Sequence, residues 1–190
     1  MNFYKQSSMV NLNILEGEVD IAIIGLNPTK EAIQIGAVFS RDRGFWNILE
    51  KAGIIRDTSN VLKENLAKEV FLEHKHSKFN VGFADLLPHI DETDSSKVKV
   101  EIGYARNLVK TLAVHKTKKV ALMGQKVVDG FSKEYPKIKR WNQLEKMDNK
   151  KQYGKIGEIN FEGHKMEIYA MPFPVNTNIP NKHLAYNKLI

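Results

Sequence analysis

The sequence of 190 residues contains no cysteine. This excludes disulfides, thiolate nucleophiles, and zinc or iron–sulfur sites held by cysteine. The chain also has no run near the ~18 apolar residues of a membrane-spanning helix, so we expect no membrane contact. Residues 1–9 lack the apolar core of a signal peptide. Together these absences favour a protein of the reducing cytoplasm.

Recognisable cofactor motifs are missing as well. No glycine-rich phosphate loop or dinucleotide fingerprint follows any candidate strand. His74 and His76 are spaced two residues apart, which places them on opposite sides of a helix and makes them a poor metal-binding pair. There is no internal repeat and no low-complexity linker. We therefore expect one domain over residues 1–190, acting as a monomer without a cofactor or a metal ion.

The chain has fewer acidic than basic residues. It contains 22 aspartates and glutamates and 29 lysines and arginines, which gives a net charge of +7. A basic protein favours an anionic partner, of which nucleic acid is the commonest, although lysine-rich proteins can be basic without one. Residues 136–157 are especially rich in lysine and include Trp141 and Tyr153. This segment is either a solvated surface excursion or a basic arm that contacts phosphates.

Apolar runs alternate with helical patterns along the chain. The patterns predict four strands, at Ile21–Gly25, Phe79–Leu87, Lys119–Gly124 and Met166–Met171. They predict helices at Gly44–Ile54, Asn60–His76, Lys97–His115 and Gln125–Glu134, with Thr93–Ser96 as a capping cluster before the third. This alternation indicates an α/β fold of three layers, α/β/α, around a central, mainly parallel four-stranded sheet.

The first strand leads directly into a constrained turn. Five apolar or small residues at 21–25 suit a strand that is buried on both faces. Gly25 permits a sharp turn, and Pro28 disfavours helical geometry at Asn27. Open α/β sheets bind ligands at the carboxyl ends of their strands. The Asn27 amide is therefore placed to position a water molecule or to read the edge of a base.

Two further segments carry candidate site residues near strand ends. Phe39 lies among small and polar residues, where it can stack on a flat ligand or pack in the core. Arg41 and Arg43 can grip phosphate or belong to an exposed loop of mixed charge. Asp85, at the end of the second strand, is a candidate general base or base-reading group. A buried strand-end carboxylate that caps a turn is the more common interpretation.

The last predicted strand ends in the proline-rich segment 172–181. Its three prolines exclude a regular helix or a central strand. Its three asparagines and a threonine would stand on a pre-stiffened loop, which suits ligand recognition at low entropic cost. The alternative is a surface turn that only ends the sheet.

In the order of these motifs the chain resembles the uracil-DNA glycosylase superfamily, and most closely its mismatch-specific uracil/thymine branch. The likeness extends from about Asn13 to Asn181. The matching motifs are Gly25-Leu26-Asn27-Pro28, Phe39 with Gly44-Phe45-Trp46, Ala52-Gly53-Ile54, Met123-Gly124-Gln125 and Met171-Pro172-Phe173-Pro174-Val175.

The resemblance implies that the protein excises bases from DNA. It assigns to Asn27 the positioning of the water that attacks the anomeric carbon, and to Phe39 the stacking on the flipped base. Around that base it places Gly25, Leu26 and Pro28. Contact with DNA would come from Arg41, Arg43, Phe173, Pro174, Val175, Asn176, Thr177 and Asn178.

The second motif departs from the family pattern. Phe173 and Val175 stand where the family has small polar residues, and Thr177 occupies the place of an apolar wedge. Phe173 or Ile179 could intercalate instead.

We expect a monofunctional DNA glycosylase that removes uracil or a related deaminated or mismatched base. The alternatives are a catalytically inactive or redirected relative that binds nucleic acid or a nucleobase-like ligand, and a small-molecule hydrolase that uses the same cleft.

Overall fold

The computed structural model describes residues 12–41, 43–147, 150–174 and 181–190. Its centre is a five-stranded sheet in the order β2-β1-β3-β7-β6. The strands are β1 (Ile21–Gly25), β2 (Val81–Asp85), β3 (Lys119–Met123), β6 (Gly154–Phe161) and β7 (His164–Met171). Strands β2, β1, β3 and β7 run parallel, and β6 pairs antiparallel with β7. The predicted fold class is therefore confirmed, with one strand more than predicted.

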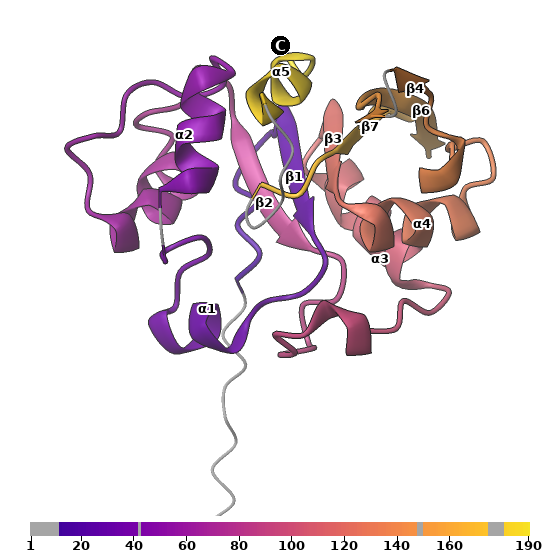
Figure 1. Ribbon diagram of the computed structural model, residues 1–190, viewed down its shortest axis with the longest axis horizontal. Coiled ribbons are helices and arrows are strands. Elements are labelled where there is room, and N and C mark those ends of the chain that lie inside the picture. Colours follow the sequence, from indigo (N-terminus) through magenta and orange to yellow (C-terminus); the bar gives the residue numbers. More distant parts are fainter. Residues whose placement is uncertain (1–11, 42, 148–149, 175–180) are drawn as a thin grey trace, which may run out of the picture.

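Helices cover both faces of the sheet, as Figure 1 shows. They are α1 (Lys30–Ile35), α2 (Gly44–Lys51), α3 (Tyr104–Val114), α4 (Gln125–Glu134) and α5 (Lys182–Asn187). The short elements are 3₁₀ turns at Lys63–Asn65, Ser95–Lys97 and Trp141–Gln143, a π-helix at Lys68–Leu72, and a hairpin of β4 (Lys146–Met147) and β5 (Lys150–Lys151).

The core has two halves, separated by the sheet. Ile21 and Ile23 point to the face covered by α2 and α5, whereas Ala22 and Ile24 point to the face covered by α3 and α4. Alternate residues of β1 thus enter opposite halves of the core, as expected for a strand buried on both faces. None of the helices in the described part of the chain is long and apolar enough to cross a membrane.

The strand that was not predicted is β6, which lies at the edge of the sheet. Its first residues fall in the lysine-rich segment 136–157, for which we predicted no strand. The side chains of Ile156 and Ile159 are buried, but their neighbours alternate irregularly because the pairing register shifts between Lys155 and Gly157. Such a bulge breaks the two-residue period on which strand prediction depends. Because lysines and glutamates interrupt the apolar pattern of this edge strand, the sequence did not predict it.

Two predicted helices are wrong in extent. The stretch Asn60–His76 holds only a 3₁₀ turn and a π-helix, not one continuous α-helix. The helix predicted from Lys97 begins at Tyr104, after Gly103 with a φ of 106°. Its amino end is capped from a distance, because the Glu134 carboxylate of α4 accepts hydrogen bonds from the N–H groups of Gly103, Ala105 and Arg106. Asp94 caps only the Ser95–Lys97 turn.

Candidate active site

A pocket of about 630 Å³ opens at the carboxyl edge of the sheet. Its floor comes from residues at the ends of three parallel strands, namely Gly25, Asp85 and Met123. Its walls come from the loops that follow those strands and from the beginning of α4. Asn27, Phe39 and Phe173, which lie far apart in the sequence, line this one cavity. The structure thus brings the first candidate loop and the start of the proline-rich segment to the same site.

The Asn27 amide is held in one orientation. Its nitrogen Nδ2 lies 2.7 Å from the main-chain oxygen of Glu92, 3.1 Å from that of Ile90 and 3.0 Å from that of Pro28. Because only the NH₂ end can donate to carbonyl oxygens, these three contacts fix which side of the amide is nitrogen. Within the described residues no hydrogen-bond donor reaches Oδ1 of Asn27. That oxygen can accept a hydrogen bond from a water molecule in the pocket.

Helix α1 begins directly after this turn and was not expected from the sequence. Thr29 is its N-cap, and the threonine hydroxyl accepts a hydrogen bond from the Ala32 N–H at 3.1 Å. Glu31 and Ala32 of α1 line the pocket. A helix of six residues is too short for a periodic apolar pattern, so the sequence marked it mainly by its cap residues, Thr29 and Gly36.

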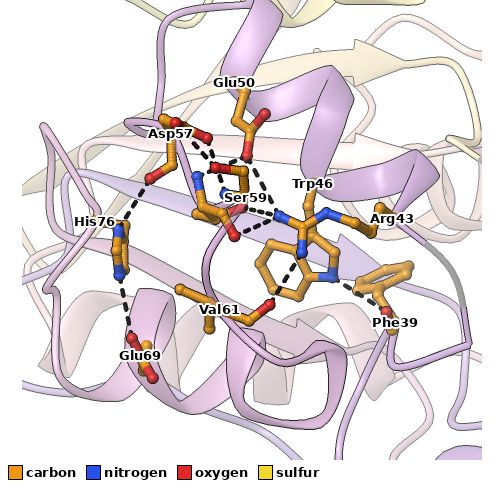
Figure 2. A network of polar contacts seen from close by, with 10 residues as sticks. Phe39, Arg43, Trp46, Glu50, Asp57, Ser59, Val61, Glu69 and His76 are labelled. Carbon is orange, nitrogen blue, oxygen red and sulfur yellow. Dashed lines mark hydrogen bonds and ion pairs between the residues drawn. The ribbon is translucent and has the colours of Figure 1, made fainter.

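Phe39 is held in an unusual backbone conformation. Its φ of 52° lies in the left-handed region, which non-glycine residues rarely adopt. The Trp46 indole nitrogen donates a hydrogen bond to the Phe39 carbonyl at 3.1 Å, as Figure 2 shows. The Phe39 ring stacks on Phe45 with centroids 3.9 Å apart. Surroundings that hold a strained residue in place are typical of functional sites. Phe39 packs on the core and also lines the pocket, so core packing and stacking on a ligand do not exclude each other.

The two arginines of this loop have different environments. Arg41 is exposed and lines the pocket. Arg43 instead donates hydrogen bonds to the main-chain oxygens of Val61 and Thr58, and lies 3.8 Å from the Glu50 carboxylate. Figure 2 shows its guanidinium directed into this cluster. We expected Arg43 to contact DNA; in the structure its guanidinium is hydrogen-bonded to Val61 and Thr58, which favours a structural role.

The proline-rich segment is described only in part. Residues Val175, Asn176, Thr177 and Asn178, which the sequence assigned to DNA contact, lie outside the described residues. Phe173 is partly exposed and lines the pocket. The two prolines beside it are held by α5, because Tyr186 Oη donates to the Pro172 carbonyl at 2.9 Å and Lys182 Nζ to the Pro174 carbonyl at 2.8 Å. Helix α5 thereby fixes the start of the segment.

Asp85 is the one buried carboxylate in the pocket wall among the described residues. Its exposed fraction is 4%, and burial raises the pKa of its carboxyl to about 7. The sequence left open whether this residue is functional or caps a turn. No described group of three or more histidines and acidic residues could hold a metal ion.

Comparison with known protein families identifies the superfamily of the chain. The model of the uracil DNA glycosylase superfamily matches residues 13–187, which include the whole sheet and every described residue that lines the pocket. No curated protein matches significantly. Members of this superfamily are generally hydrolases that cleave glycosidic bonds, and they act on DNA. The chain belongs to the uracil DNA glycosylase superfamily.

Proposed function

We propose that this protein is a monofunctional DNA glycosylase that removes uracil or a related deaminated or mismatched base. We further propose that it is closest to the mismatch-specific uracil/thymine branch. The observation that carries the proposal is the locked amide of Asn27, which shares a pocket with the ring of Phe39. One group can orient water, the other can stack on a base, and both stand at one edge of the sheet.

The target bond lies inside a duplex, so the nucleotide must first leave the base stack. Extruding it costs a few kcal/mol, which contacts in the pocket and along the DNA backbone have to offset. A net charge of +7 favours those backbone contacts. Arg41, exposed at the mouth of the pocket, is the described side chain best placed to reach a phosphate.

Once the base is in the pocket, one face of Phe39 can stack on it. The other face is covered by Phe45. Stacking on an aromatic side chain is worth about 1–3 kcal/mol per base. It favours every flat base, so it holds the base without selecting it. Selection has to come from polar groups elsewhere on the wall.

Hydrolysis then breaks the N-glycosidic bond, and the electron pair leaves with the base. The oxygen of the water held by Asn27 Oδ1 adds to the anomeric carbon, and one proton of that water ends on the released base by way of solvent. An amide cannot act as a strong base, so Asn27 orients the water without taking its proton. Catalysis then depends on stabilising the leaving base.

The direct test uses the full chain and duplexes that contain U·G, U·A, T·G or hypoxanthine, followed by alkali and gel electrophoresis. We expect strand breaks at one or more of these bases after alkali, and none before it. Intact strands in all four duplexes after alkali would refute the glycosylase proposal.

A second candidate is favoured by Phe173, which lines the pocket where the family motif has a small polar residue. In this version the protein binds nucleic acid or a nucleobase-like ligand without cleaving it. It predicts DNA binding that weakens steeply with salt, with no base release from any duplex. Measuring both base release and binding with the same four duplexes therefore discriminates between the two candidate functions.

A further inference from the structure

Two of the main-chain oxygens that hold the Asn27 amide belong to a long connection between β2 and α3. This connection, residues 86–103, is called the β2–α3 loop below, and it contains the 3₁₀ turn Ser95–Lys97. Its residues Ile90 and Glu92 accept hydrogen bonds from Asn27 Nδ2 at 3.1 and 2.7 Å. A functional side chain is held precisely only if the groups around it are themselves held. The orientation of Asn27 therefore depends on what holds the loop.

The ammonium group of Lys126, in the first turn of α4, holds the middle of this loop. Lys126 Nζ donates hydrogen bonds to the main-chain oxygens of Ser95, of Ser96 at 3.1 Å and of Val98 at 2.7 Å. An ammonium group has three donors and no acceptor, so these three carbonyls use its full capacity. Hydrogen bonds from a charged donor are stronger than those between neutral groups. Lys126 therefore fixes residues 95–98 against α4.

Further hydrogen bonds within the loop connect this contact to Glu92. The Asp94 N–H donates to Glu92 Oε1 at 2.8 Å. Asp94 Oδ1 in turn accepts hydrogen bonds from the N–H of Ser96 at 3.0 Å and from its hydroxyl at 2.7 Å. Residues 92–96 thus form one short, internally bonded unit. A displacement of this unit from α4 would also displace the Glu92 carbonyl that accepts from Asn27.

We propose that Lys126 is a positioning residue, which holds the Asn27 amide in its water-binding orientation through the β2–α3 loop. This inference rests on the proposed glycosylase function. The three donors of Lys126 are used by the loop, so Lys126 acts on the loop and not on the base. Without Lys126, the loop carbonyls shift and the amide can turn its oxygen away from the water. Misplacing such a group slows the chemical step, although the substrate still binds.

Two lysines of α4 offer a matched pair of variants. Lys133 lies about two turns after Lys126 on the same helix, and its ammonium donates to the main-chain oxygen of Val100 at 3.2 Å. Replacement by Met at either position removes one positive charge and keeps an unbranched side chain. Both replacements should therefore weaken nonspecific DNA binding alike. They differ because Val100 lies beyond the unit 92–96 that reaches Asn27.

Single-turnover base release from a uracil duplex, at saturating protein, separates the two variants. We expect Lys126→Met to release the base about 10–10²-fold more slowly than the wild type, with the same half-saturation as Lys133→Met. Lys133→Met should release it at the wild-type rate. Urea unfolding checks that each variant is folded under the assay conditions, and Lys126→Gln replaces Lys126→Met, with the same expectation, if the latter does not fold. A wild-type rate after replacement of Lys126, or equal slowing in both variants, would overturn the proposal.

Combining variants tests whether Lys126 acts through Asn27. In an Asn27→Ala background no amide remains to be positioned, so adding Lys126→Met should slow base release no further. If Lys126→Met slowed release by the same factor with and without Asn27, Lys126 would act on the base or a phosphate by itself, and the positioning role would be refuted.

If the wild type releases no base at all, the proposed function fails, but the positioning role is still tested by NMR. The pair of side-chain amide resonances that disappears in Asn27→Ala identifies the Nδ2 protons. In the wild type and in Lys133→Met these protons should exchange slowly with solvent, because they are donated to carbonyl oxygens. Lys126→Met should lose this protection. Equal exchange rates in Lys126→Met and the wild type would contradict the inference.

Discussion

The rings of Phe39 and Phe45 stack with centroids 3.9 Å apart and planes 24° from parallel. Phe45 therefore covers one face of Phe39, and a base has to stack on the opposite face. Replacing Phe39 with Ala should remove that stacking surface. The duplex concentration needed for half-saturation should rise about 5–150-fold, the equivalent of 1–3 kcal/mol. Phe39→Tyr keeps the aromatic face and should stay near the wild type. Equal half-saturation for Ala and Tyr would show that Phe39 only packs against the core.

The two arginines of the same loop make a matched pair of variants. Arg43→Gln loses charge-assisted hydrogen bonds to Thr58 and Val61, so it should lower the free energy of unfolding by about 2 kcal/mol. It should leave the salt dependence of DNA binding unchanged. Arg41→Gln should leave stability unchanged and reduce the slope of log affinity against log salt by about 1. Urea unfolding and binding titrations check both, and the opposite pattern would reverse the assignments.

Tyr186 connects α5 to the start of the proline-rich segment. Its hydroxyl is fully buried, and Tyr186→Phe would leave the Pro172 carbonyl without that donor. We expect a loss of about 1–3 kcal/mol in the free energy of unfolding. Tyr104→Phe is the control, because among the described residues the Tyr104 hydroxyl bonds only to exposed His89, and its loss should cost under about 0.5 kcal/mol. Equal losses in both variants would contradict the anchoring role of Tyr186.

The raised pKa of Asp85 also predicts a pH dependence of stability. Folding raises this pKa from its ordinary 3.8 to about 7, so the folded protein binds the proton more tightly than the unfolded chain. This contribution to stability is complete below about pH 4 and is lost as the pH rises to about 7, by up to about 4 kcal/mol. Asp85→Asn lacks the titration.

Urea unfolding of both proteins at pH 5 and pH 8.5 tests the sign of that effect. The wild type should lose stability relative to Asp85→Asn as the pH rises. A difference that stays constant, or changes in the opposite direction, would contradict a neutral buried Asp85.

Local patterns in the sequence were sufficient for the main strands and insufficient for features that depend on pairing. The run Ile21–Gly25 was predicted with the bounds it has in the structure, because apolar residues between turn-formers leave little choice. The start of α3 was missed because its cap, Glu134, comes from another helix. The place of Asp85 in the pocket wall depends on the register between β1 and β2, which no local pattern encodes.

In the candidate site, too, some residues could be predicted from local motifs, whereas contacts between distant residues could not. Asn27 and Phe39 follow from a motif next to a recognisable strand, and the structure places both in one pocket. The structural contacts of Arg43 could not be predicted, because a sequence does not reveal that Val61 and Thr58 accept hydrogen bonds from its guanidinium. The sequence also could not show that Phe39 combines the two roles proposed for it, since this depends on a positive φ and the hydrogen bond from Trp46.

The central claim is that the Asn27 amide orients the attacking water, and base release under single-turnover conditions tests it most directly. With a duplex that contains uracil, Asn27→Ala should release the base about 10²–10³-fold more slowly than the wild type. It should bind the same duplex with nearly unchanged affinity, because the proposed role of Asn27 is to hold the water and not the base or the phosphates. Release by Asn27→Ala at the wild-type rate would contradict the account.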